Sequence, residues 1–596
     1  MKDKNATRWN LEDIYQKTAR KKIFEELTGS IKIINSYYSK MAPEMPEKVF
    51  LSFISYYEAS AEKLSRLIYK PYLQKETDQK SSEALRQKHL ALGLHMKLTE
   101  SSRKTWQWVM GKEVPGKKKL DNLNAKRLFK NAGEMKYILQ RKRAKAVYAL
   151  NEREENIIDN KDLTGNEVLT SLRTLIETEM EFFFKPRGVR KGRKIQSIAE
   201  LTKYVFWEKT EFRKEAYLKL LTGFRKNIDK YFLIYHAVVK DWVYERKLRG
   251  YKEPISIRNE SNNISDEAVQ ALLSVCREKK EIYQDFFRIK AKMLNMKKLN
   301  RHDIYAPVIT AGEKKISYQD SLKLVMDVFG SFSSGFSERA GKIIDSRHID
   351  VFPDKKKVSG AFCATVSPEV VPYILLNHTG KYRDVLTLAH ELGHGIHSLY
   401  CTDLSYSAQG SSLPLAETAS TFCEMLVFEQ MYARASGRKE KIDLLVSKLS
   451  DSYATVLRQN YFIKFEQEVH KKINSGITAE SVSDIYFRIL TEQFGESVSV
   501  DPLFRYEWAY IPHIVHTPFY CYAYSFGELL SLSLYYQYKT KGKVFIHTII
   551  KILKTGGSKD PVKTLKKAGI DVSKKKFWRD GFKIIENWKD ELVELI

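Results

Sequence analysis

The sequence predicts a mainly α-helical protein with one small region of β-strand. Glycine and proline, the residues that most often interrupt helices, number only 28 and 15 among 596 residues. Apolar residues recur every three or four positions over long stretches, which is the period of an amphipathic helix. Between 358 and 377 small and β-branched residues replace this period, and a strand is expected there. Hydrophobic residues make up 43% of the chain, ample for a large core.

The helical period divides the chain into three segments. The spacing of apolar residues predicts consecutive helices over residues 1–110. The same spacing predicts a second helical segment over residues 111–196, which ends with a small hairpin around the basic stretch 185–194. Residues 197–596 return to long helices, with a loop expected at 251–263, and carry the chemical motifs described below.

The net charge of +28 raises the question of a nucleic-acid partner. The basic residues are spread along the chain rather than gathered on one segment, which favours solvated helix faces. The densest cluster, 185–194, is accompanied by no zinc-finger spacing, RNA-binding aromatic signature or phosphate-cradling loop, so it is assigned no role. We therefore expect no nucleic-acid partner despite the charge.

Cysteine usage and hydropathy indicate the compartment. The five cysteines are far apart and form no Cys-x-x-Cys pair, as expected for free thiols in a reducing cytoplasm. The first residues contain no apolar run, and no stretch approaches 18 consecutive apolar residues. We expect a cytoplasmic protein without a membrane partner.

The sequence HELGH at 390–394 lies in a stretch of helical period, where Asp384 is a good N-cap. His390 and His394 are four residues apart, so on a helix their rings share one face and can bind one metal ion. Glu391 is offset by one residue and can take a proton from a water beside that ion. The pattern predicts zinc; a helix with two hydrogen-bonded structural histidines is the less favoured alternative.

Zinc sites of this type have a third protein ligand and an open fourth position. The next predicted helix begins near Ser411 and carries Glu417 among small and apolar neighbours that favour burial. Glu417 is therefore the predicted third ligand. Glu424, on the same face of that helix, and His397 are predicted to orient the ligands, and an ordinary structural hydrogen bond is the alternative for both.

Residues 508–528, WAYIPHIVHTPFYCYAYSFGE, are rich in histidine and tyrosine. Tyrosines at such spacing are more often core residues. A hydrolytic zinc site also needs hydrogen-bond donors for the negative oxygen that develops on the substrate carbonyl, and His or Tyr side chains can supply them. On the residues alone both interpretations stay open.

Taken together, these motifs resemble oligoendopeptidase F, of the thimet-oligopeptidase superfamily of zinc peptidases. The resemblance covers essentially the whole chain. It includes RWNLEDIY at the start, KLRGYKEPISIRNESNNIS at 247–265, LNRHDIYAPV at 299–308, SGAFCATVSPEVVPYILLNHTG, TLAHELGHGIHS, LAETASTFCE, the His/Tyr stretch and KTGGSKDPVKTLKKAGID at 554–571.

The resemblance implies a fold and a set of roles. Two helical lobes would close around a deep substrate channel, with a small β-sheet next to the HExxH helix. One zinc ion per chain would be bound by His390, His394 and Glu417, with Glu391 as general base. The residues implied to pair with substrate backbone are Pro372, Tyr373, Ile374, Leu375, Leu376 and Asn377. The residues implied to stabilise the tetrahedral intermediate are His513, Tyr520, Tyr522 and Tyr524, with His516 as the alternate.

The predicted function is zinc-dependent hydrolysis of internal bonds in short, unstructured oligopeptides. The predicted partners are short peptides, and a monomer is the default, with an oligomer left open. Two alternatives of other classes remain. One is a zinc-free or inactive peptide-binding protein with the same fold, and the other is a nucleic-acid-binding protein, which the net charge would suit.

Overall fold

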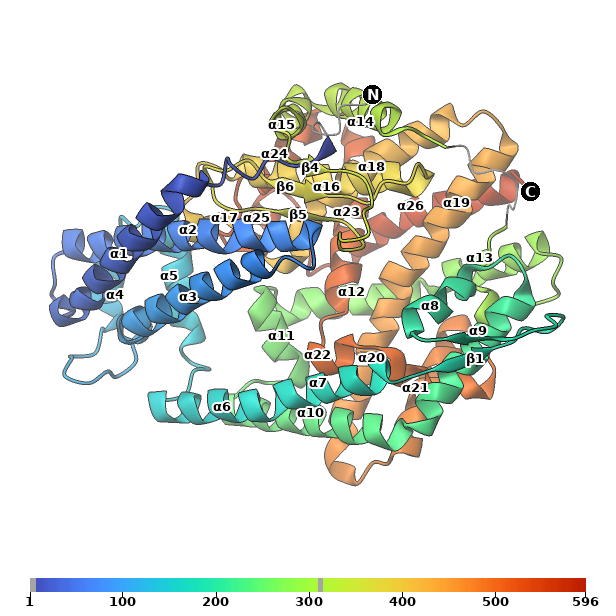
Figure 1. Cartoon of the computed structure of the whole chain (residues 1–596), viewed down its shortest axis with the longest axis horizontal. Coiled ribbons are helices and arrows are strands. Elements are labelled where there is room, and N and C mark those ends of the chain that lie inside the picture. The colour runs from blue at the N-terminus through green and yellow to red at the C-terminus, as the bar shows by residue number, and fades with distance from the viewer. Residues whose placement is uncertain (1–6, 309–314) are drawn as a thin grey trace. The chain divides into compact units, whose positions relative to one another are not determined.

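The computed structural model describes residues 7–308 and 315–596 and forms two compact units (Figure 1). Each unit is assembled from separated stretches of chain. The first contains Met1–Ala149, Glu313–Met431 and Gln537–Ile570. The second contains Leu150–Gly312, Tyr432–Tyr536 and Asp571–Ile596. The predicted segments 1–110, 111–196 and 197–596 are divisions along the chain, whereas these units are divisions in space.

The first unit is helical around one small sheet. Its helices are α1 (Arg20–Lys40), α2 (Glu47–Thr77), α3 (Ser82–Val109), α4 (Asn122–Leu128), α5 (Met135–Lys145), α14 (Tyr318–Phe332), α15 (Ser334–Asp345), α16 (Tyr382–Tyr400), α17 (Tyr406–Gln409), α24 (Val544–Leu553) and α25 (Pro561–Lys567). Helices α1, α2 and α3 pack side by side (Figure 1). Their core is continuous with one face of the sheet and includes Phe50, Trp108 and Tyr373.

The sheet has three short strands in the order β4 (Ile349–Asp350), β6 (Tyr373–Leu375), β5 (Phe362–Ala364). Strand β6 runs parallel to β4 and antiparallel to β5. Helix α16 packs against β5 and β6. The predicted small sheet beside the HELGH helix is therefore present.

The second unit is also helical. Its helices are α6 (Glu152–Thr164), α7 (Asn166–Thr178), α8 (Ile198–Thr202), α9 (Thr210–Lys226), α10 (Ile228–Arg249), α11 (Pro254–Asn262), α12 (Asp266–Glu278), α13 (Lys280–Met293), α19 (Arg438–Ser452), α20 (Arg458–Lys472), α21 (Ala479–Phe494), α22 (His513–His516) and α26 (Lys575–Glu594). Strands β3 (Leu299–Asn300) and β7 (Val498–Ser499) pair in parallel. Helices α18 (Leu413–Arg434) and α23 (Tyr522–Lys541) each contain a point where the chain passes between units.

Several local expectations can be compared with these elements. The predicted hairpin is confirmed, since β1 (Phe182–Phe184) pairs antiparallel with β2 (Arg193–Ile195) around the basic stretch. The prediction of a loop at 251–263 is wrong, because α11 occupies most of this segment. Proline lacks the N–H that the first helical position leaves unpaired anyway, so Pro254 starts this helix instead of breaking it.

The start of α16 also differs from its prediction. The helix begins at Tyr382, so Asp384 lies in its first turn and not at the N-cap. The Asp384 carboxylate accepts hydrogen bonds from the backbone N–H groups of Gly380 at 2.9 Å and Lys381 at 3.0 Å. A carboxylate in the first turn accepts hydrogen bonds from N–H groups that have no partner within the helix. Its negative charge is also stabilised by the positive end of the helix dipole. The residue stabilises the helix start, but from three positions inside it.

Candidate metal centre

Helix α16 presents the two histidines of HELGH on one face. Leu388 and Leu392, on the opposite side, are fully buried and anchor the helix in the core. His390 and His394 are partly exposed, and their ring centroids are 4.9 Å apart with an interplanar angle of 80°. The helical spacing therefore places both rings where they can reach one ion.

Gly393 allows helix α18 to approach α16 closely. A Cβ atom at this position would lie 2.6 Å from Cα of Ser420 and 2.8 Å from the carbonyl oxygen of Ala419. Both are backbone atoms, which cannot rotate aside. The absence of a side chain at 393 thus lets α18 bring Glu417 to the two histidines.

The three donor atoms have the spacing of a zinc ligand shell. Oε2 of Glu417 lies 3.3 Å from Nε2 of His390 and 3.4 Å from Nε2 of His394. Zinc bonds of about 2.0–2.1 Å at tetrahedral angles would separate two ligand atoms by about 3.3–3.4 Å. One donor atom from each residue lies within 4.8 Å of the other two. The donor set and its geometry therefore fit a zinc ion with three protein ligands.

The charges of these side chains are coupled. Burial acts to lower the pKa of His390, but the carboxylates of Glu417 and Glu424 outweigh it and raise this pKa to about 10. Burial acts to raise the pKa of Glu417, but the two imidazoles hold it well below its usual range. Negative carboxylates facing imidazole nitrogens in a cavity form a site that favours a cation.

Two further side chains contact the ligands. Ser420 Oγ donates a hydrogen bond to Oε2 of Glu417 at 3.1 Å. Oε2 of Glu424 lies 3.4 Å from Nδ1 of His390. A partner at Nδ1 fixes the tautomer that leaves Nε2 free for a metal. Glu424 lies where a ligand-orienting role requires it, and Ser420, which the helical spacing places on the same face as Glu417 and Glu424, is a second contact.

His397 is brought to the same cavity but makes a different contact. Its Nε2 lies 3.0 Å from Oγ of Ser411, the residue expected to begin the next helix. The side chain is buried, and burial, helped by the neighbouring charge of His394, lowers its pKa to about 4. His397 is therefore neutral near pH 7 and ties α16 to the segment that precedes α18.

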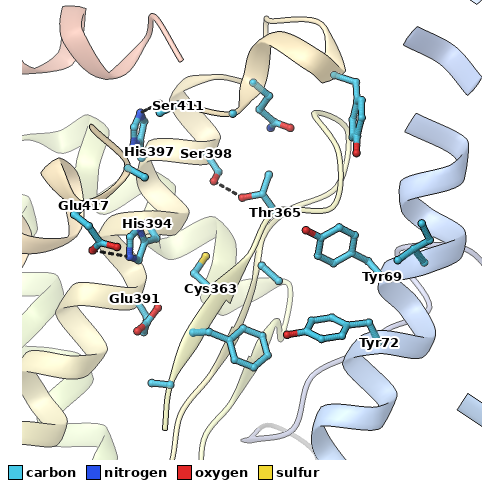
Figure 2. A pocket seen from close by; sticks show the side chains of 18 of the residues that line it. Tyr69, Tyr72, Cys363, Thr365, Glu391, His394, His397, Ser398, Ser411 and Glu417 are labelled. Carbon is cyan, nitrogen blue, oxygen red and sulfur yellow. Dashed lines mark hydrogen bonds and ion pairs between the residues drawn. The ribbon is translucent and has the colours of Figure 1, made fainter. Parts of the chain in front are cut away.

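Glu391 points into the cavity beside the donor atoms (Figure 2). Only 6% of the residue is exposed, and burial raises the pKa of its carboxyl group. In the described part of the chain no side chain forms a hydrogen bond or ion pair with this carboxylate. A carboxylate with raised pKa and no partner is suited to accept a proton from water.

The cavity around these residues has a volume of about 1090 Å³. Figure 2 shows His394, Glu391 and Glu417 on one side and two tyrosines of α2, Tyr69 and Tyr72, on the other. Strand β5 lies between them and contributes Phe362, Cys363 and Ala364. The cavity lies wholly within the first unit and is large enough to accept several residues of a peptide.

The strand expected to pair with substrate needs a correction. Strand β6, within the predicted 372–377 segment, is the centre of the sheet and is hydrogen-bonded on both sides. Tyr373, Ile374 and Leu375 are fully buried, and the side-chain amide of Asn377 donates to the carbonyls of Val358 and Gly360. This strand has no free edge for a peptide. Strands β4 and β5 are the two edges of the sheet. Next to β4 the N–H of Val351 already donates to the carbonyl of Thr7, whereas β5 lines the cavity, so β5 offers the edge for a peptide.

The register identifies which groups of β5 face outward. Ile374 donates its N–H to a carbonyl on the β4 side of the sheet, so the backbone groups of its neighbours Tyr373 and Leu375 face β5. These two residues oppose Ala364 and Phe362, which are therefore the hydrogen-bonded pairs. The N–H and C=O of the intervening Cys363 consequently point away from β6, toward the open edge.

The His/Tyr stretch lies in the second unit, where three of its members form a cluster. The rings of His513 and Tyr520 stack 5.8 Å apart with an interplanar angle of 4°. The hydroxyl of Tyr524 lies 3.3 Å from Nε2 of His513. Burial and nearby positive charges lower the pKa of His513, so its ring is neutral near pH 7.

Tyr522 and His516, the other two candidates of the stretch, differ from this cluster in their burial. Tyr522 is fully buried, and its hydroxyl accepts a hydrogen bond from the side-chain amide of Asn262 at 2.8 Å. His516, the alternate, is exposed.

Comparison with known proteins now identifies the family. The model of peptidase family M3 matches residues 206–584. The chain belongs to peptidase family M3. The predicted resemblance to oligoendopeptidase F is confirmed, and the protein is a metalloendopeptidase.

Relatives and solved structures agree with the M3 assignment. The oligoendopeptidase F homolog of Borreliella burgdorferi is 26% identical over 575 residues, which cover 95% of this chain and 94% of that protein. A solved structure from Chlamydophila abortus has a TM-score of 0.86 at 23% identity and covers 99% of this chain and 98% of its own. Oligoendopeptidase F from Enterococcus faecium has a TM-score of 0.70 at 18% identity, with 97% and 98% covered. The mainly helical fold with a small sheet is thereby confirmed.

The M3 chain also carries contacts that no sequence motif indicates. Arg258 of α11 and Glu466 of α20 both bind the backbone just before Tyr520: Nε of Arg258 donates to the carbonyl of Pro518, and a Glu466 carboxylate oxygen accepts from the N–H of Phe519. Because a loop is expected at 251–263, the sequence does not predict the position of Arg258 on a helix face. Helical spacing of Arg258 and Asn262, one turn apart, is the signal that could have found it.

Among the helices of the described residues, none combines the length and apolar character needed to cross a bilayer.

Proposed function

We propose that this M3 peptidase is a zinc-dependent endopeptidase that hydrolyses internal bonds of short, unstructured peptides. The observation that carries the proposal is the ligand-like spacing of His390, His394 and Glu417. Glu391 lines the same cavity, which adds the base that such a reaction needs. One zinc ion per chain is expected.

The metal would be held by Nε2 of His390, Nε2 of His394 and Oε2 of Glu417. When bound, zinc lowers the pKa of a water in its open position and polarises a carbonyl oxygen. Glu424 and Ser420 hold His390 and Glu417 in the orientation that this role requires.

Glu391 is the proposed proton carrier. Its carboxylate takes a proton from the attacking water while the water oxygen adds to the carbonyl carbon of the scissile bond. When the C–N bond breaks, Glu391 passes that proton to the departing amine nitrogen, and the products are a carboxylic acid and an amine. Because burial raises the pKa of Glu391, its carboxylate is a stronger base than an exposed one.

The substrate would lie along β5 as an added strand. The outward N–H and C=O of Cys363 can pair with the peptide backbone, in the manner of β-augmentation. Only an extended backbone can make these bonds, which favours unstructured peptides over folded proteins. Tyr69 and Tyr72, on the opposite side of the cavity, offer aromatic surface to substrate side chains.

His513, Tyr520 and Tyr524 are the proposed donors for the negative oxygen of the tetrahedral intermediate. Their clustering supports this role, since one group supplies an imidazole and two hydroxyls together. Donors of this kind are worth about 2.7–4 kcal/mol each in the transition state. Tyr522 is left out of the proposal because its hydroxyl is buried against Asn262.

We further propose a cytoplasmic monomer that acts on peptides and not on nucleic acid. All five cysteines are free thiols, which suits a reducing compartment. The basic hairpin around 185–194 gives no indication of a nucleic-acid site, so we attribute the positive charge to solvent-exposed helix faces.

The experiment measures bound zinc and the cleavage of quenched-fluorescent peptides with and without a chelator. Near one zinc per chain and chelator-sensitive internal cleavage are expected. Glu391→Gln should keep its zinc and lose at least about 10³-fold in kcat. Glu100→Gln, an exposed residue of α3, is the control and should keep both. Full turnover by the Glu391 variant would refute the assignment, and zinc without any cleavage would favour a peptide-binding protein.

A further inference from the structure

A second cavity lies wholly within the second unit and has a volume of about 570 Å³. Helices α7, α8 and α20 line it together with residues 510–513. Its wall includes His513, a proposed catalytic residue, and Arg458, to which the mechanism above gives no role. A volume of this size suits one or two amino-acid residues of a bound peptide.

Arg458 has no carboxylate partner among the described residues. Its guanidinium makes one long hydrogen bond, 3.4 Å to the hydroxyl of Tyr305, and lies 5.2 Å from the ring centroid of Phe462. Both contacts are to uncharged groups. A largely buried guanidinium in such surroundings is costly unless a negative group joins it.

The acidic residues around the cavity are already paired with other arginines. Glu177, on the cavity wall, lies 2.8 Å from the guanidinium of Arg173. Glu507, whose charge acts on Arg458, lies 2.6 Å from the guanidinium of Arg301 and also accepts from Tyr486. Arg173 and Arg301 are thus paired with the two glutamates. The remaining positive charge is that of Arg458, which lines the cavity.

The backbone before Arg458 departs from regular α-helix. Residues 453–457 form a π-helical turn, a feature that often marks functional sites because it reorients the residues that follow. The next residue, Gln459, also lines the cavity, and its buried Oε1 has no hydrogen-bond partner. Because Oε1 is an acceptor, it suits an N–H group of a bound peptide, while the guanidinium of Arg458, which has no carboxylate partner among the described residues, suits a negative group.

We propose that Arg458 binds a carboxylate of the peptide substrate in this cavity. The inference rests on the proposed peptidase function and specifies the substrate class. Arginine forms bidentate hydrogen bonds with carboxylates, and such bonds are stronger where water is excluded. A C-terminal carboxylate and an Asp or Glu side chain share this chemistry, so the experiment must separate them.

The first test uses the wild-type enzyme and four matched quenched-fluorescent peptides. Two lack acidic residues and end in a free carboxylate or an amide. The other two end in an amide and carry either Glu or Gln at one internal position. If the C-terminus is bound, the amide raises KM about tenfold over the free acid with little change in kcat. If a side chain is bound, the Glu peptide shows the lower KM.

The second test uses variants of the arginine. Arg458→Met should abolish the discrimination between the preferred peptide and its neutral match, and Arg458→Lys should retain part of it. Arg190→Met removes the same charge from the exposed hairpin of the same unit and should keep the full discrimination. The dissociation constants of all four peptides are also measured on the Glu391→Gln protein, so that binding is read without cleavage.

The outcomes separate the two proposals. Cleavage of all four peptides with equal KM values, and equal dissociation constants, would overturn the inference while the peptidase function stands. Absence of cleavage would count against the proposed function, and the binding comparison would still decide the role of Arg458. If Arg458→Met does not fold, the wild-type comparison of acid with amide and of Glu with Gln decides the proposal alone.

Discussion

Glu466 and Arg258 hold the two ends of one peptide group. Oε1 of Glu466 accepts from the N–H of Phe519 at 2.7 Å, and Nε of Arg258 donates to the carbonyl of Pro518 at 3.1 Å. That N–H and that carbonyl belong to the same peptide bond. Phe519 is held at a φ of 58°, a left-handed conformation that costs a non-glycine residue about 1–2 kcal/mol. The two side chains stabilise this turn directly before Tyr520.

The first prediction concerns the stability that this arrangement provides. Glu466→Leu leaves the buried N–H of Phe519 without an acceptor. We expect the free energy of unfolding, measured in urea, to fall by about 1–3 kcal/mol. Glu496→Gln, an almost fully exposed residue of the same unit, should change it by less than about 0.5 kcal/mol. Equal stability of the two variants would contradict the structural role.

The second prediction follows from the titration of the same carboxyl group. Burial raises the pKa of Glu466 from its ordinary value of 4.5 to about 8. Between these values the folded chain keeps a proton that the unfolded chain has released, so this group makes the free energy of unfolding fall as pH rises through the window. Glu466→Gln cannot titrate and should gain stability relative to wild type from pH 5 to pH 8. Parallel urea-unfolding results for both proteins across this range would refute it.

The third prediction tests the close approach of α16 and α18. Gly393→Ala places a Cβ 2.6 Å from the backbone of Ser420, so α18 must shift and carry Glu417 with it. We expect zinc affinity, measured by competition with a chelator, to fall at least tenfold. Gly330→Ala in α14 of the same unit is the control. Its Cβ would meet nothing closer than 3.8 Å, and zinc affinity should be unchanged. A Gly393 variant with wild-type affinity would show that α18 can adapt without moving its ligand.

Local patterns in the sequence predict much of this site. The spacing of His390 and His394 and the small, apolar surroundings of Glu417 identify three residues that the structure brings within 4.8 Å. Such patterns work because helical geometry is fixed by spacing along the chain. The hairpin at 182–195 is predicted for the same reason, since it depends on neighbouring residues alone.

Features that depend on long-range packing could not be predicted in this way. The apolar run at 372–376 indicates a strand, but its position at the centre of the sheet is set by β4 and β5. A fully buried central strand and a ligand-binding edge strand have similar composition, so composition cannot separate them. The contacts of Arg258 and Arg458 likewise depend on residues more than 150 positions away.

The fourth prediction separates the proposed metal ligand from the residue that orients it. Glu417→Gln replaces a charged donor with a neutral amide at the centre and should abolish stoichiometric zinc binding. Glu424→Gln weakens the contact to Nδ1 of His390 and leaves the three proposed ligands in place, so zinc affinity should fall about 10–100-fold and the ion should still bind at saturating concentration. Zinc titrations followed by a competing fluorescent chelator measure both. Equal losses in the two variants would remove the distinction between ligand and orienting residue.

The last prediction tests β5 as the strand that pairs with substrate. The N–H of Cys363 faces the open edge, so Cys363→Pro removes a donor to the peptide without removing a hydrogen bond to β6. We expect KM for an unstructured peptide to rise about two- to tenfold, as the loss of one hydrogen bond predicts, with folding retained. Cys363→Ala controls for the thiol and should keep KM close to wild type. Ala364→Pro instead removes a bond of the ladder to Tyr373 and should destabilise the first unit. A proline at 363 that leaves KM unchanged, while the protein stays folded, would mean that the peptide does not use this edge.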